Sequence, residues 1–319
     1  MSDAHPVIVF TEPCDPVPMQ WLRERAEVIQ SSDADPALSS HLARAEGLVV
    51  RTYTKVTPAF LDRAPRLRVV GRGGVGIENI DVAECRRRGI EVVHTPDANT
   101  LAVGDFVFGL IIRLIRDLPE FKEKAFSPAE FKRIRDAARG RQLNEMTWGI
   151  LGMGRVGRRV GHIAANGFSM RVIYNDIVDV KSLLDFPADA VEKDRLYREC
   201  DILGIHVDMR KGNENLVGEK QIAMMKKGAF LLNTSRGEVL DAGAVATAIR
   251  SGHLAGAAVD VYAPEPPPAD FPLVGLPNVI LTPHLASRTY IAMENMSWVV
   301  RDVLAVIQGQ KPKYPAPQR

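Results

Sequence analysis

Cysteine is scarce in this sequence, which argues against a fold held together by disulfides or zinc. The 319 residues include three cysteines, Cys14, Cys85 and Cys200, which are widely spaced and odd in number. No pair of them has the close spacing of a zinc-binding or redox motif. A small, dispersed set is typical of proteins kept reduced, so we expect a cytoplasmic location and no metal site.

The sequence also lacks an excess of charge of either sign and any long apolar run. Lysine and arginine number 41 against 39 aspartate and glutamate residues, a net charge of +2, so no nucleic-acid partner is expected. The most apolar stretch, residues 101–115, is interrupted by Asp105 and Arg113, which predicts a buried helix and no membrane contact. The first six residues show no basic segment followed by an apolar run, so no signal peptide is expected.

What the sequence does contain is a regular alternation of apolar strands and helical stretches. Its length and its 46% hydrophobic composition are sufficient for two domains with separate cores. The alternation predicts an α/β fold with two Rossmann-like domains built on parallel sheets. Strands are expected at residues 7–10, 47–50, 67–70 and 91–94, and then at 147–151, 170–174, 202–206, 229–233, 256–261 and 279–282.

The order of the helices predicts where the domains divide. A long helix is expected over residues 99–118, and a second over 128–140, with Ser127 as N-cap and Glu130 three residues later. A last helix, over residues 290–308, follows the final strand and can return to the first domain, leaving an extended, mobile tail over 311–319. We therefore predict a discontinuous substrate-binding domain, residues 1–98 plus 289–319, and a cofactor-binding domain, residues 99–288.

A glycine-rich turn predicts a dinucleotide site. Gly152, Gly154 and Gly157 have G-x-G-x-x-G spacing and lie between an apolar strand and a helical pattern that starts at Arg155. The first glycine permits a tight turn, the second lets backbone approach a pyrophosphate, and the third lets helix and strand pack closely. The helix N-terminus then offers N–H groups to the phosphates.

An acidic residue at the end of the next strand favours NAD over NADP. Asp176 lies 24 positions after Gly152 (176 − 152), close to the spacing of a carboxylate that binds the adenosine ribose and repels a 2′-phosphate. The adjacent Asn175 can face the ribose instead, and a simple Asn-Asp turn is the other alternative. We predict NAD as the cofactor.

Three later residues, Arg236, Glu265 and His284, form a candidate catalytic set. A cation can bind and polarise a carbonyl, an imidazole can supply a proton, and a carboxylate can keep that imidazole charged near neutral pH. Taken singly, such residues are usually solvated. Behind a dinucleotide-binding sequence, they predict hydride transfer between NAD(H) and the C2 atom of a small 2-hydroxy or 2-keto acid.

Taken together, these motifs resemble those of the D-isomer-specific 2-hydroxyacid dehydrogenases, which include D-3-phosphoglycerate dehydrogenase and hydroxypyruvate–glyoxylate reductases. The resemblance implies an active site in the cleft between two Rossmann-like domains, a homodimer, and here a short form without a regulatory domain. It is carried by residues 50–57, 70–81, 95–100, 148–157, 233–241, 259–261, 265–266 and 283–284.

The resemblance also implies roles for individual residues. Arg236 would bind the substrate carboxylate and polarise its carbonyl. His284 would be the general acid in reduction and the base in oxidation, and Glu265, 19 positions earlier, would pair with it. The remaining implied contacts are the N–H groups of Gly74, Val75 and Gly76 with the substrate carboxylate, Arg155 and Val156 with the pyrophosphate, Asp176 with the ribose, Val207 with the cofactor, and Thr234 and Asp260 with the nicotinamide.

Two features leave the substrate and part of the cofactor site open. Residues 207–212 stand where the family commonly has a Pro-Leu-x-Pro loop, which puts local cofactor contacts in doubt. Arg51 and Lys55 lie in a first-domain loop expected at the far end of the substrate, which indicates an anionic tail such as a phosphate or second carboxylate. The alternative is that Arg51 is structural and Lys55 is solvated.

Two other functions remain compatible with the same motifs. Formate dehydrogenase belongs to the same superfamily, but its pattern needs a Gln paired with the His, where this chain has Glu265. A corepressor-like scaffold that senses NAD can keep the same three residues without using them. Turnover of any 2-keto acid distinguishes the enzyme from the scaffold.

Overall fold

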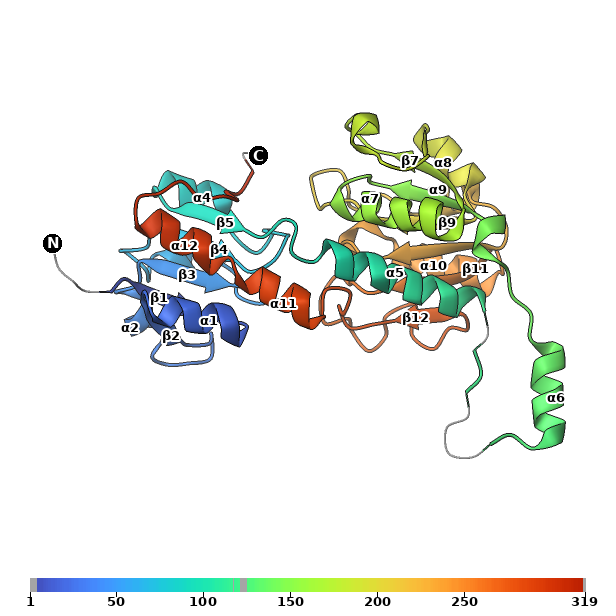
Figure 1. Cartoon of the computed structure of the whole chain (residues 1–319), viewed down its shortest axis with the longest axis horizontal. Helices are drawn as coiled ribbons and strands as arrows, with labels where there is room; N and C mark the ends of the chain where they lie inside the picture. Colours follow the sequence, from blue (N-terminus) through green and yellow to red (C-terminus); the bar gives the residue numbers. More distant parts are fainter. Residues whose placement is uncertain (1–4, 117, 121–124, 318–319) are drawn as a thin grey trace. The chain divides into compact units, whose positions relative to one another are not determined.

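The computed structural model describes residues 5–116, 118–120 and 125–317, which form two compact units (Figure 1). Unit 1 contains Met1–Asn99 and Ser287–Arg319, and unit 2 contains Thr100–Ala286. Each unit has one parallel sheet with helices on both faces. The predicted α/β class with two parallel sheets is therefore confirmed.

The sheet of unit 1 has five strands in the order β2-β1-β3-β4-β5. They are β2 (Glu27–Gln30), β1 (Val7–Phe10), β3 (Gly47–Val50), β4 (Val69–Arg72) and β5 (Glu91–His94). Strand β2 was not predicted, because only two of its four residues are apolar, as is common for a strand at the edge of a sheet. Strand β4 begins two residues later than expected, because Leu67 belongs to the preceding turn, where its N–H donates to the Ala64 carbonyl at 3.1 Å.

Helices cover both faces of this sheet. One face carries α1 (Pro16–Arg23) and α12 (Val300–Ile307), with α11 (Tyr290–Ser297) against α1; the other carries α2 (Leu38–Leu42), α3 (Pro58–Leu61) and α4 (Val82–Arg87). Helix α12 approaches β3 and β4 closely. A Cβ on Gly47 would lie 2.9 Å from a methyl group of Val303, and a Cβ on Gly71 would lie 2.4 Å from one, so glycine at these positions permits the approach. The last helix does return to unit 1, but as two helices separated at residues 298–299.

The C-terminal tail is ordered against the sheet, so the prediction of a mobile tail is wrong for residues 313–317. The His94 N–H donates to the Tyr314 carbonyl at 3.1 Å, and the Ala316 N–H donates to the Val92 carbonyl at 2.7 Å. Ala316 is buried in the core beneath α2–α4. Its burial and these two hydrogen bonds stabilise the ordered arrangement; residues 318–319 lie outside the described part.

The sheet of unit 2 has seven strands in the order β12-β11-β10-β9-β6-β7-β8. In that order they are Val279–Leu281, Leu254–Val259, Ala229–Asn233, Ile202–Ile205, Thr147–Leu151, Arg171–Asn175 and Asp189–Ala190. The short β8 was not predicted, and the bounds of β7, β9, β11 and β12 differ from expectation by one or two residues. The order reverses between β6 and β9, and ligands of such sheets bind at the carboxyl ends of the strands around this point.

Helices α5 (Thr100–Ile115) and α7 (Arg155–His162) lie on one face of this sheet, and α8 (Lys193–Glu199), α9 (Glu219–Met224) and α10 (Ala242–Arg250) on the other. Residue 117, within the helix predicted to reach residue 118, lies outside the described part. Helix α7 continues into a π-helical turn, Ile163–Gly167. Short 3-10 turns occur at Leu143–Glu145, Lys181–Leu183 and Gly237–Val239.

Helix α6 (Pro128–Ala137) has the predicted capping box between Ser127 and Glu130 but ends three residues before the predicted Gly140. None of its residues is buried, and Phe131 is 49% exposed. The apolar face expected on this helix therefore belongs to no core in the described part of the chain.

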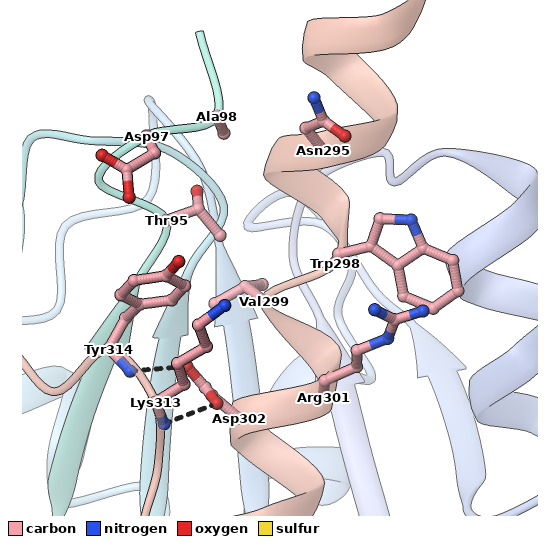
Figure 2. Close-up of a pocket in the computed structure, with 10 residues that line it drawn as sticks. All are labelled: Thr95, Asp97, Ala98, Asn295, Trp298, Val299, Arg301, Asp302, Lys313 and Tyr314. Carbon is pink, nitrogen blue, oxygen red and sulfur yellow. Dashed lines mark hydrogen bonds between the residues drawn. The ribbon is translucent and has the colours of Figure 1, made fainter. Parts of the chain in front are cut away.

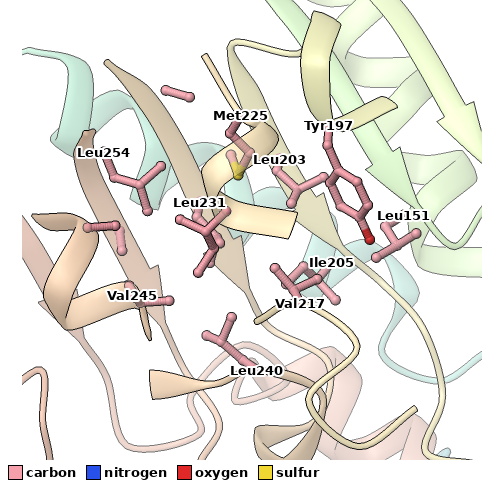
Figure 3. Packing of buried hydrophobic residues seen from close by; sticks show 14 of the residues in the cluster. Leu151, Tyr197, Leu203, Ile205, Val217, Met225, Leu231, Leu240, Val245 and Leu254 are labelled. Atoms are coloured by element: carbon pink, nitrogen blue, oxygen red, sulfur yellow. The ribbon is translucent and has the colours of Figure 1, made fainter. Parts of the chain in front are cut away.

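Strand β10 shows why the strands of unit 2 are continuous apolar runs. Ala229 and Leu231 face the core beneath α8–α10, whereas Phe230 and Leu232 face the core beneath α5 and α7. Figure 3 shows Leu231 in the first of these cores, near Leu203 and Ile205 of β9. Because both faces are buried, successive residues must both be apolar.

Candidate active site

The glycine-rich turn joins β6 to α7, and each of its glycines has a distinct surrounding. Gly152 has φ +95°, and a Cβ there would lie 2.8 Å from the His206 carbonyl oxygen. A Cβ on Gly157 would lie 2.1 Å from the Gly152 carbonyl oxygen, so helix and turn are in direct contact. Beside Gly154, the residue before α7, a Cβ would meet no atom within 4 Å. The turn therefore has open space where a pyrophosphate needs it.

Asp176 faces this turn from the end of β7. Its Oδ2 accepts the Met153 N–H at 2.7 Å, and its Oδ1 accepts the Val178 N–H at 3.0 Å. The neighbouring Asn175 donates instead to the Val191 carbonyl at 2.8 Å. Of the two adjacent candidates, Asp176 is thus the one at the glycine-rich turn, and a carboxylate with two donors keeps acceptor capacity for ribose hydroxyls.

The other predicted cofactor residues lie at the same edge of the sheet. Arg155 and Val156 begin α7, while Val207, Thr234 and Asp260 follow β9, β10 and β11 directly or closely. The Thr234 hydroxyl is buried and has no partner among the described residues. An unpartnered buried hydroxyl and the open backbone at Gly154 fit a dinucleotide at this edge.

Asp260 is fully buried and holds the segment that carries His284. Its carboxylate accepts the Thr282 hydroxyl at 2.6 Å and the N–H groups of Leu285 and Ala286 at 2.8 and 2.9 Å. Three internal donors occupy most of its acceptor sites. The structure thus gives Asp260 a structural role, and its predicted contact with the nicotinamide stays a prediction.

His284 and Glu265 are in direct contact. Nδ1 of His284 lies 2.9 Å from Oε2 of Glu265, whose Oε1 accepts the Tyr262 N–H at 3.0 Å. The His284 backbone is left-handed, with φ +53°, a conformation that costs energy in a non-glycine residue and is concentrated at functional sites. Because Nδ1 is bound to the carboxylate, Nε2 is the nitrogen left for proton exchange with a substrate.

Arg236 belongs to the same group of charges. Burial raises the pKa of Glu265, but hydrogen bonds from His284 and Tyr262 and the charges of His284 and Arg236 outweigh burial, so the net pKa lies below the usual value. The turn that carries Arg236 is built by Asn233, which accepts the N–H and hydroxyl of Ser235 and donates to the Arg236 carbonyl at 2.8 Å. The three catalytic candidates therefore gather in unit 2.

The candidates for substrate binding lie in unit 1. Gly74 has φ +154°, and its N–H donates to the Arg72 carbonyl at 2.8 Å, so this predicted donor is already used. The N–H groups of Val75 and Gly76 have no acceptor among the described residues. Arg51 is half-buried with Nη2 3.2 Å from the Met293 sulfur.

The atypical segment after His206 forms its own ion pair. Nε and Nη2 of Arg210 donate to Oδ1 of Asp208 at 2.8 and 2.6 Å, and the Asn213 amide donates to the Asp208 carbonyl at 2.8 Å. The negative charge that Asp208 adds near the cofactor edge is therefore balanced by Arg210.

Sequence reasoning assigned no role to two residues that organise the unit 1 candidates. Glu12 accepts backbone N–H groups from the loop that carries Arg51, and Asn79 donates to carbonyls of the same loop. The available signal was position, because Glu12 follows the carboxyl end of β1, where ligands of parallel sheets bind.

A pocket of about 260 Å³ in unit 1 contains none of the candidate residues (Figure 2). It is lined by Thr95, Asp97 and Ala98, by residues of α11, α12 and the turn between them, and by the C-terminal tail. Asp302 accepts the N–H groups of Lys313 and Tyr314 at 2.9 Å each, and the Arg301 guanidinium lies 3.7 Å from the Trp298 ring centroid. The two hydrogen bonds to Asp302 attach the tail to α12, and none of the residues that line the pocket is a candidate catalytic or binding residue.

Among the described residues, none of the helices combines the length and the apolar character required to cross a membrane. The same residues include no group of three or more His, Cys, Asp or Glu side chains placed to hold a metal ion.

Comparison with known proteins identifies relatives of this arrangement. Residues 108–286 match the model of the D-isomer specific 2-hydroxyacid dehydrogenase, NAD binding domain. The chain is 32% identical to a glyoxylate reductase of Thermofilum pendens, over 97% of this chain and 94% of that protein. It is 34% identical to human D-3-phosphoglycerate dehydrogenase. That match covers 88% of this chain and 52% of the human protein. A solved D-lactate dehydrogenase from Aquifex aeolicus, complexed with NAD and lactic acid, has a TM-score of 0.80 at 28% identity, covering 95% of this chain and 96% of that one.

These matches confirm the family, the reaction class and the nicotinamide cofactor predicted from the sequence. The family model covers more than half of the chain and falls within unit 2, which holds the glycine-rich turn and the His284–Glu265 pair. The chain is an oxidoreductase that belongs to the D-isomer-specific 2-hydroxyacid dehydrogenase family, with its NAD-binding domain in unit 2.

Proposed function

We propose that this enzyme reduces a small 2-keto acid that carries a second anionic group, with NADH as donor, using Arg236, Glu265 and His284. The observation that carries the catalytic assignment is the 2.9 Å contact between His284 and Glu265, with Arg236 close enough to lower the pKa of the same carboxylate. A glutamate in this pair also favours the 2-hydroxyacid dehydrogenases over formate dehydrogenase, whose pattern needs a Gln.

The three side chains divide the work of reduction. When bound, the reduced cofactor supplies the hydride that the C2 atom receives. His284, protonated, gives its Nε2 proton to the carbonyl oxygen as negative charge develops there, and Arg236 stabilises that charge. Glu265 holds the ring by Nδ1, which leaves Nε2 for the proton transfer. In oxidation, the neutral ring takes the hydroxyl proton back.

Binding of the substrate carboxylate is assigned to the N–H groups of Val75 and Gly76. Both residues lie in a glycine-rich segment where backbone can approach a ligand closely, and successive N–H groups form anion-binding concavities. Gly74 supports the turn by its positive φ and by its hydrogen bond to Arg72. Arg236 completes the recognition of the acid in this proposal.

Arg51 is proposed to bind the anionic tail. Burial lowers the pKa of its guanidinium, with a smaller effect from the Arg288 charge, so an anion beside Arg51 would compensate for both. D-3-phosphoglycerate dehydrogenase, whose name states a phosphorylated substrate, is among the relatives. Arg51→Ala should raise KM for phosphohydroxypyruvate more than for pyruvate. An equal rise for both acids would contradict the assignment.

NAD is proposed over NADP, because Asp176 faces the glycine-rich turn and would repel a 2′-phosphate.

A homodimer is also proposed. Its support is α6, which buries none of its ten residues and exposes Phe131 in the described part of the chain. Sedimentation of the 35.1 kDa chain at twice that mass would support the dimer, and a monomer would contradict it.

The catalytic assignment is tested by His284→Ala. The variant should lose most of the turnover of 2-keto acids, because the proton donor is gone, and should still bind NADH with wild-type affinity. Near-full turnover would show that another group supplies the proton.

A further inference from the structure

Glu12 lies two residues beyond β1 and binds the loop of residues 51–54 through four successive backbone N–H groups. Its Oε1 accepts from Arg51 at 2.9 Å and from Tyr53 and Thr54 at 3.1 Å each. Its Oε2 accepts from Thr52 at 2.9 Å. Successive N–H groups that converge in this way form a nest that binds an anion. Here the anion is a side chain of the protein itself.

The charge of Glu12 matters to this arrangement. Burial raises the pKa of Glu12, but the four N–H groups outweigh burial and bring the pKa below its usual value. Hydrogen bonds to a carboxylate are about twice as strong as those between neutral groups. A glutamine of the same shape has one acceptor oxygen in place of two, and its NH₂ group would face N–H donors. The loop is therefore matched to a carboxylate.

Asn79 binds the backbone carbonyl groups of the same loop. Its Nδ2 donates to the carbonyl of Arg51 at 3.1 Å and to that of Thr54 at 2.7 Å. The buried Thr54 hydroxyl also donates to the hydroxyl of Thr11 at 2.7 Å. Since Asn79 lies three residues after Gly76, it joins the loop to the segment assigned to the substrate carboxylate.

The fixed backbone presents two side chains that the loop does not use for its own structure. Tyr53 is 82% exposed. The Arg51 guanidinium lies against the Met293 sulfur of α11, and Arg51 Cγ lies 3.5 Å from the Cβ position of Gly73. A shift of the loop would therefore move Arg51 relative to the glycine segment.

We propose that Glu12, with Asn79 at the carbonyl groups of the loop, is a positioning residue that fixes residues 51–54 and thereby sets the affinity of the enzyme for its 2-keto acid. This inference rests on the proposed function, because it takes Arg51 as a substrate contact. The Glu12 carboxylate is occupied by the loop, so Glu12 acts in this proposal through Arg51.

The test compares Glu12→Gln with Glu27→Gln, a matched change on the same unit, where Glu27 forms an exposed ion pair with Arg44. Hydrogen exchange of the amides of residues 51–54 is measured first. Loss of a charge-assisted hydrogen-bond set should speed exchange at these amides by about tenfold or more in Glu12→Gln, with no change in Glu27→Gln.

Steady-state kinetics with phosphohydroxypyruvate and NADH form the second measurement. Glu12→Gln should raise KM by about tenfold, leave kcat within about threefold, and leave the Kd of NADH unchanged, because only substrate binding depends on the loop. Glu12→Asp, which keeps the charge, should recover part of the lost affinity. A merely structural role would lower the amount of active enzyme without changing KM.

The two measurements distinguish this proposal from the proposed function. Unchanged exchange in Glu12→Gln overturns the proposal, even in a protein that reduces no 2-keto acid. Faster exchange with an unchanged KM in an active enzyme also overturns it, because the loop would then move without consequence for the substrate. Faster exchange in a protein that turns over no acid supports the role of Glu12 in the loop while the proposed function fails.

Discussion

Replacing Glu265 by glutamine removes one charge from the pair with His284 while keeping the size of the side chain. The glutamine can still accept one hydrogen bond, but it is neutral where the carboxylate carries a charge. In the native pair the contact joins Oε2 and Nδ1 at 2.9 Å, and the Glu265 and His284 side chains are 28% and 43% exposed. This combination of short distance and partial exposure decides the size of the expected effect.

A hydrogen bond to a charged group contributes about 1.5–3 kcal/mol, and partial exposure places this one at the low end, about 1.5–2 kcal/mol. With tenfold in rate for each 1.36 kcal/mol, kcat should fall by about 10- to 30-fold. The Kd of NADH should not change, because the glycine-rich turn is untouched.

The assay is NADH oxidation at saturating 2-keto acid, with NADH binding followed separately by fluorescence. Glu238→Gln, which changes an exposed carboxylate two residues from Arg236, is the matched control and should keep wild-type kcat. In a His284→Ala background, Glu265→Gln should cost less than about twofold, because the two residues act as one unit. Full kcat in Glu265→Gln, or an undiminished loss in the double variant, would show that Glu265 does not act through His284.

Three further predictions concern the surrounding structure. Asp260→Asn should lower the free energy of unfolding by about 2–4 kcal/mol, because a buried carboxylate with three donors is replaced by an amide, whereas the exposed Asp270→Asn should change it by less than about 0.5 kcal/mol in urea titrations. The ring nitrogens of His206 are buried, and desolvation lowers its pKa from 6.5 to about 4, so the unfolded chain binds the proton more tightly. Its contribution is complete above pH 6.5 and is lost as pH falls to about 4; the loss should reach about 3 kcal/mol and be absent in His206→Asn, and an equal pH slope in the variant would contradict it. Asp176→Ala should lower the ratio of kcat/KM with NADH to that with NADPH by about tenfold or more; an unchanged ratio would contradict its role at the ribose.

The parts of the fold that were predictable are those with strong local signals. The interior strands of unit 2 are buried on both faces, so they appear as apolar runs. The glycine-rich turn and the capped helix start at Ser127 depend on residues close in sequence, and the structure contains both. Local chemistry determines these features, so a single sequence reveals them.

The errors occurred where distant contacts decide the structure. The tail at residues 313–317 has no strand pattern; it is ordered because β5 and Asp302 offer partners far away in sequence. Strand β2 exists because β1 supplies its neighbour, not because its own residues are apolar. The same holds in the candidate site, since Glu12 meets the loop of residues 51–54 across about forty positions. Contacts between residues far apart in the chain produce no periodic pattern in the sequence, so they could not be predicted from it.

The proposed reaction is best tested by NADH oxidation with the purified protein and hydroxypyruvate, glyoxylate, pyruvate, 2-ketoglutarate or phosphohydroxypyruvate, each repeated with NADPH. We expect turnover with NADH, greatest for an acid with a second anionic group, weaker turnover with NADPH, and loss of the activity in His284→Ala. Binding of NADH without reduction of any of these acids would contradict it and would favour a protein that senses the cofactor without using it.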